Sequence, residues 1–426
     1  MRRLIAFRDY MAFVYGAEWK PLLGIAATVF GFATGFLPRW VPITLLVVSV
    51  LLVLLDGWEI YRRWKGARLL NNRDRLESYP FTGVVWSAED GTFESLASIG
   101  AAQAPRIWTD HAVNAALAQS PALGAEAPVQ VVTQPYQLPA DLAGLSAQAL
   151  RRTASPRASV DTRVKRPLWF NGRLARLMTE PTTTALEGSP FQFQQVRYFD
   201  GQTSNELWHW TRDRSLEDEE AVRLPRPYVV DAQGRLLSLG QARVANIVGI
   251  SLVAVTSDDQ VLMVIQSSQN SVNPGGFAVS ASGSLDWADV TVREGTGLRE
   301  VVLSGMLREL HEESGVHPDE VIRESARITA YFRWLARGAK PEFCGFVRRR
   351  VTSEEVLARR PMGQEVLFTQ GTVAVPAALL LDPSSQWGRD LSALREHLEQ
   401  VVPGTLNAGA STIATWHAAA ALTSGS

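Results

Sequence analysis

The stretch Arg308-Glu309-Leu310-His311-Glu312-Glu313-Ser314-Gly315-Val316 places four charged side chains directly before a glycine. At 3.6 residues per turn, Glu309 lies three and four positions from Glu312 and Glu313, so three carboxylates crowd one helix face. Their repulsion costs roughly a few tenths of a kcal/mol per pair unless a cation neutralises them, and hard oxygen ligands suit Mg²⁺ or Mn²⁺. The stretch therefore predicts a helix with metal ligands Glu309, Glu312 and Glu313, ended by a left-handed Gly315.

The pattern Arg-Glu-apolar-x-Glu-Glu-x-Gly-apolar resembles the core of the Nudix box, and Glu300 stands where that family has its upstream glutamate. The resemblance implies that Arg308, Glu309 and Glu312 are catalytic. One position departs from the family, because Glu294 occupies the place of the first glycine of the box. This departure bears on the shape of the entry loop and on substrate class. The alternative is an acidic surface helix with no ligand.

The rest of the C-terminal region, residues 226–426, reads as a compact α/β domain. Strand-like runs at 247–256 and 261–265 flank a polar turn, and the apolar stripe of Val302, Met306 and Leu310 predicts a helix over 298–313. Further strands are expected at 328–335 and around Cys344, and helices near 392–401 and 413–422. The resemblance implies a Nudix-like fold, a mixed sheet between helices. Glycines let a backbone approach a ligand closely, and the candidate nucleotide-binding residues are Gly276, Gly283 and Arg333.

Composition limits the remaining possibilities. The chain has 426 residues and a formal net charge of −1, which gives no reason to expect a nucleic-acid polymer as partner. Its single cysteine, Cys344, excludes an internal disulfide and a cysteine-based zinc cluster. We interpret Cys344 as a packing residue of a strand rather than as a nucleophile.

Two uncharged runs near the N-terminus, residues 21–37 and 40–55, predict a transmembrane hairpin within a membrane region of residues 1–68. Basic residues flank the hairpin on both sides, which favours cytoplasmic termini of a multi-pass inner-membrane protein. Ala27, Gly31 and Gly35 recur every four residues, a spacing that lets helices approach closely. This face serves either oligomerisation in the membrane or packing within the hairpin.

Residues 69–225 are expected to form a connector and accessory region. Aromatic and β-favouring residues at 79–86 and 191–199 predict strands, and the section from 99 to 165 carries turn signals. Basic residues gather between Arg151 and Arg166. They form either a solvated or membrane-facing patch or a site for an anionic ligand.

This order of parts resembles the two-transmembrane Nudix-domain effectors of bacterial CBASS antiphage systems, the SMODS-associated Nudix family. The resemblance implies a membrane-bound effector that senses a cyclic di- or trinucleotide, forms homo-oligomers on activation and perturbs the bilayer of the inner membrane, leading to abortive infection. The alternative is a membrane-tethered, Mg²⁺-dependent Nudix hydrolase of a nucleoside-diphosphate-linked substrate. A third reading makes the acidic helix a metal-stabilised element of a scaffold.

Overall fold

The computed structural model describes most of the chain between residue 91 and residue 401, with gaps, and isolated positions outside it. The described residues are 13, 38, 40–41, 43–44, 46–48, 50–51, 69–71, 91–95, 106–119, 127–146, 149–150, 171–212, 226–267, 276–361, 369–381, 392–401, 412, 415–416 and 418–419.

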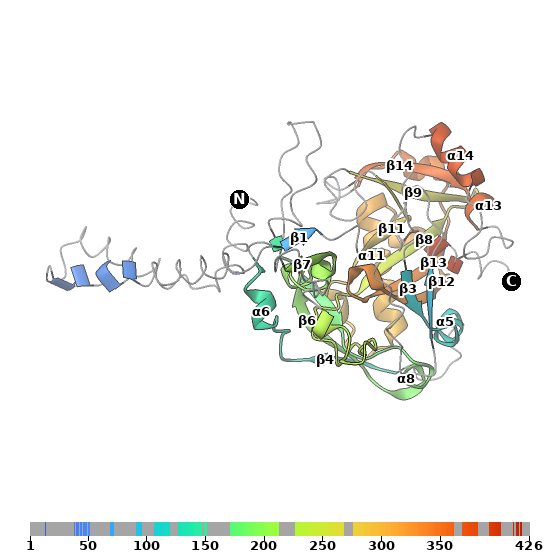
Figure 1. The fold of residues 1–426 in the computed structure, drawn as a ribbon. Coiled ribbons are helices and arrows are strands. Elements are labelled where there is room, and N and C mark those ends of the chain that lie inside the picture. The colour runs from blue at the N-terminus through green and yellow to red at the C-terminus, as the bar shows by residue number, and fades with distance from the viewer. Residues whose placement is uncertain are drawn as a thin grey trace.

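One mixed sheet forms the centre of the fold, and its strands run in the order β10-β9-β8-β13-β12-β3-β2, with β11 also on β8 and β14 also on β9 (Figure 1). The β8–β13 pair is parallel and the other pairs are antiparallel. The strands are β2 (Thr92–Ser95), β3 (Arg106–Thr109), β8 (Gly249–Val255), β9 (Gln260–Gln266), β10 (Phe277–Ala278), β11 (Ala281–Ser284), β12 (Val321–Trp334), β13 (Lys340–Arg349) and β14 (Thr369–Pro376).

Two smaller sheets come from the first half of the chain. β4 (Val129–Val132), β6 (Phe191–Arg197) and β5 (Arg173–Leu177) form a three-stranded sheet, and β1 (Leu69–Asn71) pairs with β7 (Trp210–Arg212). The helices of this half are α5 (His111–Ala118), α6 (Ala140–Ala143), α8 (Thr183–Gly188) and α9 (Tyr198–Gln202). Residues 69–225 thus supply strands to the central sheet as well as a sheet of their own. The division of the chain into three regions stays a prediction.

The central strands are buried on both faces. On β13, Phe343 and Val347 pack into the core that includes Met306 and Leu310, whereas Cys344 and Phe346 pack into a second core on the opposite face. Alternate side chains of a strand point to opposite faces, so β13 lies between two layers. The second core also receives residues of the later helices α13 (Ala377–Leu380) and α14 (Ser392–Val401), and Trp416.

Helix α11 (Leu298–Ser314) covers the first face and carries the charged stretch. Its Val302, Met306 and Leu310 are buried, as the apolar stripe predicts, and Gly315 ends it with φ 68° while its N–H donates to the carbonyl of His311. The helix begins after Gly297, and the shorter helix α10 (Trp287–Thr291) precedes it. Another short helix, α12 (Ser353–Leu357), follows β13. The predicted helix and its glycine stop are confirmed.

Other local predictions are confirmed as well. The hairpin expected at 247–265 is β8 and β9, which meet at Val255 and Val261, and the helix expected at 392–401 is α14. The strand expected at 191–199 is β6 followed by α9. The strand expected at 79–86 and the basic residues from Arg151 to Arg166 lie outside the described residues.

The predicted transmembrane hairpin is wrong, and so is the multi-pass inner-membrane location. Among the helices that the structure describes, none has both the length and the apolar character needed to cross a membrane. The helical residues described within the second run lie between Trp40 and Leu51. The first run, with Ala27, Gly31 and Gly35, lies outside the described residues.

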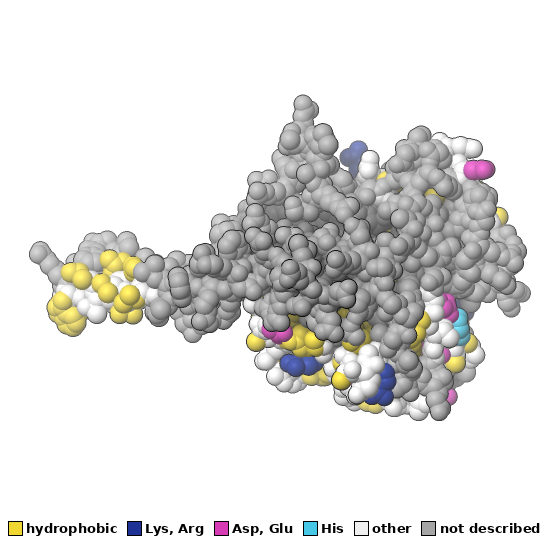
Figure 2. All heavy atoms as spheres, in the orientation of Figure 1, with side chains coloured by type: hydrophobic (Ala, Val, Ile, Leu, Met, Phe, Trp, Pro, Cys, Tyr) yellow, Lys and Arg dark blue, Asp and Glu magenta, His cyan; other side chains and the backbone are white. Residues whose placement is uncertain are grey.

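Several apolar side chains of that N-terminal segment are exposed to solvent. Trp40 is 69 % exposed and Leu51 is 53 % exposed, and Figure 2 shows yellow side chains gathered at this end of the molecule.

Gly345 of β13 faces α11, and there is no room for a side chain at this position. A Cβ there would lie 2.5 Å from Sδ of Met306 and 3.1 Å from the carbonyl oxygen of Arg327. We expect Gly345→Ala to lower the free energy of unfolding by about 1–3 kcal/mol, because overpacking shifts α11 against the sheet. Chemical denaturation measures this change. At Gly371 of β14 the nearest atom would be 3.9 Å away, so an equal loss in Gly371→Ala would contradict the steric explanation.

Candidate functional site

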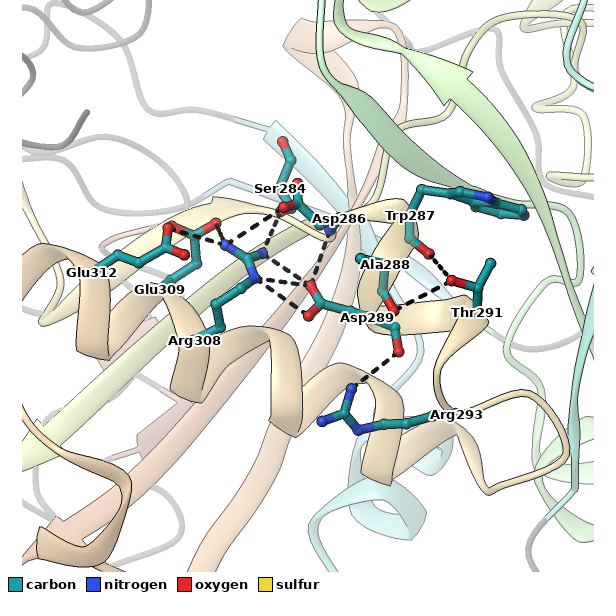
Figure 3. A network of polar contacts seen from close by, with 10 residues as sticks. All are labelled: Ser284, Asp286, Trp287, Ala288, Asp289, Thr291, Arg293, Arg308, Glu309 and Glu312. Atoms are coloured by element: carbon teal, nitrogen blue, oxygen red, sulfur yellow. Dashed lines mark hydrogen bonds and ion pairs between the residues drawn. The ribbon is translucent and has the colours of Figure 1, made fainter. Parts of the chain in front are cut away.

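The candidate site lies where α11 passes α10 and the end of β11. The chain leaves β11 at Ser284, turns through Asp286 and forms α10, which packs against α11. The backbone N–H of Asp286 donates to Oδ2 of Asp289 at 3.1 Å, which fixes the first turn of α10. This turn presents two aspartates to the side of α11 that carries Arg308 (Figure 3).

One edge of the Arg308 guanidinium is held by Asp289. Nη2 donates to Oδ2 at 2.9 Å, and Nε donates to Oδ2 at 3.1 Å and to Oδ1 at 3.3 Å. Nη2 also donates to the carbonyl of Ser284 at 3.3 Å. Two parallel N–H donors on one carboxylate make a strong, directional ion pair.

The remaining nitrogen, Nη1, faces the carboxylates of the charged stretch. It donates to Oε1 of Glu309 at 3.0 Å and to Oε2 of Glu312 at 3.3 Å, and Oδ2 of Asp286 lies 4.0 Å away. Figure 3 shows Arg308 between Asp289 on one side and Glu309 with Glu312 on the other. Three carboxylate oxygens therefore surround one cationic nitrogen. We call Asp286, Asp289, Arg308, Glu309 and Glu312 the Arg308 cluster.

The side chains of the Arg308 cluster differ in their exposure to solvent. The side chains of Asp289 and Glu309 are 8 % and 10 % exposed, whereas those of Glu312 and Asp286 are 41 % and 46 % exposed. The open pair gives the solvent, and hence a ligand, access to the carboxylates. The buried pair fixes their position.

The charges of the cluster shift its proton affinities. Burial alone would lower the pKa of Arg308, but the Glu309 carboxylate, the Asp289 hydrogen bonds and Asp286 raise it well above the usual value. Burial raises the pKa of Asp286; Arg308 opposes this rise, and the Asp289 and Glu312 carboxylates add to it. With four carboxylates and one guanidinium, the cluster carries an excess of negative charge that favours a further cation.

The structure brings Glu309 and Glu312 together at Nη1 of Arg308, and it places the Glu313 carboxylate against β11. Glu313 is 5 % exposed, and its carboxylate accepts from the backbone N–H of Ser282 on β11 at 3.3 and 3.4 Å. In the described part of the chain, no group of three or more His, Cys, Asp or Glu stands ready to hold a metal ion. The chemistry of the donors around Nη1 nevertheless suits a divalent cation, since all are carboxylate oxygens. Asp286, Glu309 and Glu312 are the residues that would hold it.

Of the two candidate glycines, Gly283 allows close packing at the site. Gly283 pairs with Ile250 on β8, and a Cβ on Gly283 would collide with the carboxylate of Glu309. Gly276 lies just before β10, and its carbonyl accepts from Gln266 N–H at 2.9 Å. Gly283 thus leaves the space that Glu309 fills. Binding of a nucleotide by either glycine stays a prediction.

Arg333 lies on β12 and is fully buried. Its Nη1 donates to Oε2 of Glu180 at 3.2 Å and to the carbonyl of Leu237 at 2.6 Å, and its Nε donates to the carbonyl of Ala339 at 3.0 Å. No contact described in the structure joins Arg333 to the Arg308 cluster. Its predicted contact with a nucleotide is untested.

Two further glutamates of the box region, Glu294 and Glu300, are not part of the Arg308 cluster. Glu300 is exposed on the first turn of α11. Glu294, at the position of the family's glycine, accepts from the backbone N–H of Val131 on β4 at 3.1 Å. The entry loop is thus paired with the three-stranded sheet, since Val129 also exchanges backbone hydrogen bonds with Gly295 and Thr296.

Asp286 and Asp289 belong to the cluster although the sequence reasoning missed them. Their signal was the spacing Asp-x-x-Asp directly before a helical run, which is typical of a helix N-terminus. That signal predicts a helix start at Asp286, but it does not predict that Asp289 meets an arginine 19 residues later.

The described surface also has a shallow depression of about 230 Å³ beyond the C-terminal end of α11. It contains no member of the Arg308 cluster, and it is lined by Pro318, Asp319, Val321, Arg323, Glu324 and Arg350.

Comparison with known proteins adds little to this geometry. No protein-family model matches the chain, and no curated protein matches it. Among solved structures, the crystal structure of DR0079 from Deinococcus radiodurans is similar to part of the chain, with 17 % identity and a TM-score of 0.24. The match covers 40 % of this chain and 80 % of DR0079. A likeness at this TM-score supports no inference about function.

Arg308 is the charge that allows four carboxylates to coexist. We expect Arg308→Met to lower the free energy of unfolding at pH 7 by about 1–3 kcal/mol, because it leaves partly buried carboxylates uncompensated. Their pKa values would then lie above the unfolded values, so the folded state binds more protons and stability should recover as the pH falls from 7 to 5. Chemical denaturation at several pH values tests this. Arg235→Met, which removes an exposed i,i+4 pair with Asp231, should change stability by less than about 0.5 kcal/mol; a similar loss there would contradict the assignment.

Cys344 is expected to be inert. It is fully buried, and burial raises the pKa of its thiol to about 12. Since only the thiolate reacts, we expect iodoacetamide at pH 8 to modify the folded protein roughly a thousandfold more slowly than the urea-unfolded protein. Mass spectrometry of the alkylated chain measures both rates. Fast labelling of the folded protein would show an accessible thiol.

Proposed function

We propose that this chain is a divalent-cation-dependent hydrolase of nucleoside-diphosphate-linked substrates. The single observation that carries the proposal is the convergence of Asp286, Glu309 and Glu312 on Nη1 of Arg308 at 4.0, 3.0 and 3.3 Å. A place that already holds one cationic nitrogen among three carboxylates has the charge and the ligand chemistry for Mg²⁺ or Mn²⁺. When bound, such an ion supplies charge that polarises a phosphoryl oxygen and acidifies a water molecule.

The residues of the chain take distinct parts in this proposal. Glu309 is buried and fills the space that Gly283 leaves, so within this proposal its carboxylate is the less mobile ligand. Within this proposal Glu312, the more exposed glutamate of the cluster at 41 %, accepts a proton from the attacking water. Arg308 orients both carboxylates. The motif resemblance to the Nudix box agrees with these roles.

A second candidate is binding without turnover, as in the cyclic-nucleotide sensors that the chain resembles. The observation that favours it is the engagement of the glutamates within the protein: Glu313 accepts from Ser282, and Arg308 occupies the centre of the carboxylates. A protein of this kind would report a cyclic di- or trinucleotide in CBASS antiviral defence, with homo-oligomerisation as its response.

We expect the full chain to release nucleotide products from one or more linear dinucleoside polyphosphates or nucleoside-diphosphate sugars when Mg²⁺ or Mn²⁺ is present. Chromatography with mass spectrometry detects the products. Glu312→Gln should lower kcat by about 10²- to 10⁴-fold, because the amide is a far weaker proton acceptor.

Glu354→Gln, an exposed change on α12, is the matched control and should keep the wild-type rate. The same preparation is mixed with cyclic di- and trinucleotides, and binding and mass are followed by calorimetry and light scattering. Tight binding without products would replace the hydrolase by the sensor. Neither binding nor products would end both proposals.

A further inference from the structure

Asp289 lies outside the charged stretch of α11, yet it makes the strongest contact in the Arg308 cluster. Its side chain is 8 % exposed and comes from α10. Oδ2 accepts from Nη2 and Nε of Arg308 and from the backbone N–H of Asp286 at 2.9, 3.1 and 3.1 Å. A carboxylate with three donors on one oxygen is fixed in position, and it fixes the arginine in turn.

The contact with Asp289 determines which N–H groups of Arg308 can reach the glutamates. Asp289 and the carbonyl of Ser284 take the Nε and Nη2 side of the guanidinium, and only Nη1 is left for Glu309 and Glu312. Each of these glutamates therefore receives one hydrogen bond from Arg308 in the structure rather than a two-pronged pair. A divalent cation that binds these glutamates would therefore have to displace only one Arg308 N–H group from each carboxylate.

We propose that Asp289 is a positioning residue that limits Arg308 to one hydrogen bond with each of Glu309 and Glu312 and so sets the affinity of these carboxylates for a divalent cation. The inference rests on the proposed function, because it concerns the same cation. Without Asp289 the guanidinium is free to turn its paired nitrogens onto a glutamate. There they compete with the cation for the carboxylate and weaken cation binding.

Helix α11 has no carboxylate of its own for this task. Glu300 lies eight residues before Arg308, about 12 Å along the helix axis, and it is exposed at the first turn. Among the described contacts, none joins Glu300 to Arg308. The carboxylate comes instead from α10, which packs beside α11.

The test measures Mn²⁺ binding to the full chain by calorimetry and by the loss of the free-Mn²⁺ electron paramagnetic resonance signal. We expect Asp289→Asn to weaken Mn²⁺ binding by about 10- to 100-fold, as outer-shell changes do at metal sites. Asp289→Glu keeps the charge and should recover most of the affinity. In an Arg308→Met background, Asp289→Asn should change the affinity by less than about threefold, because the two residues act as one pair.

Controls separate positioning from damage to the fold. Glu180→Gln removes another buried carboxylate from an arginine, Arg333, and should leave Mn²⁺ binding unchanged. Should Asp289→Asn fail to fold, Arg308→Lys tests the same inference, because an ammonium cannot make the two-pronged pair and the affinity should fall in the same direction.

The outcomes distinguish the two proposals. Wild-type affinity in Asp289→Asn or in Arg308→Lys would overturn the positioning role while the site itself stands. An equal loss with and without Arg308 would also overturn it, because Asp289 would then act by charge alone. If the wild-type chain binds no Mn²⁺, the proposed cation site and the positioning role fail together.

Discussion

The Arg308 guanidinium is the interaction on which the arrangement of the site depends. Four carboxylates from two helices meet around it, and their mutual repulsion would otherwise separate α10 from α11. A salt bridge of this kind is weak evidence for stability by itself, since desolvation offsets much of the attraction. Its effect is on geometry: the buried pair with Asp289 directs one nitrogen toward the open carboxylates. Specificity of position, rather than net stability, is what this charge provides.

Strands β4 and β5 of the three-stranded sheet contact the segment that leads into α11. Backbone hydrogen bonds join Val129 of β4 to Gly295 and Thr296, and Ala175 of β5 to Leu285. The segment from Leu285 to Gly297, which contains α10 and leads into α11, is therefore clamped by residues that lie more than one hundred positions earlier. Glu294 takes part in the clamp through Val131. Glu294 therefore has a structural role, because its side chain accepts a hydrogen bond from β4.

Local patterns predicted the elements, and long-range pairing decided how they meet. The apolar stripe and Gly315 were enough to predict α11 and its end, and the polar turn at residues 257–260 was enough to predict the β8–β9 hairpin. By contrast, Trp334 of β12 pairs with Ile107 of β3, and a pairing across such a separation leaves no trace in either segment alone. The contact of Asp289 with Arg308 likewise cannot be predicted from either segment alone.

The position of Arg308 also explains why hydrolysis and sensing are hard to separate on this site. The guanidinium offsets part of the charge of the three carboxylates around it. Either a hydrolase or a binding protein can use this arrangement. What differs is the freedom of Glu312, which is the least buried glutamate of the cluster and the one whose carboxylate solvent reaches. A general base must lie within hydrogen-bond reach of the water that it activates, and an open carboxylate meets this requirement. This asymmetry between Glu309 and Glu312 is the physical argument for turnover.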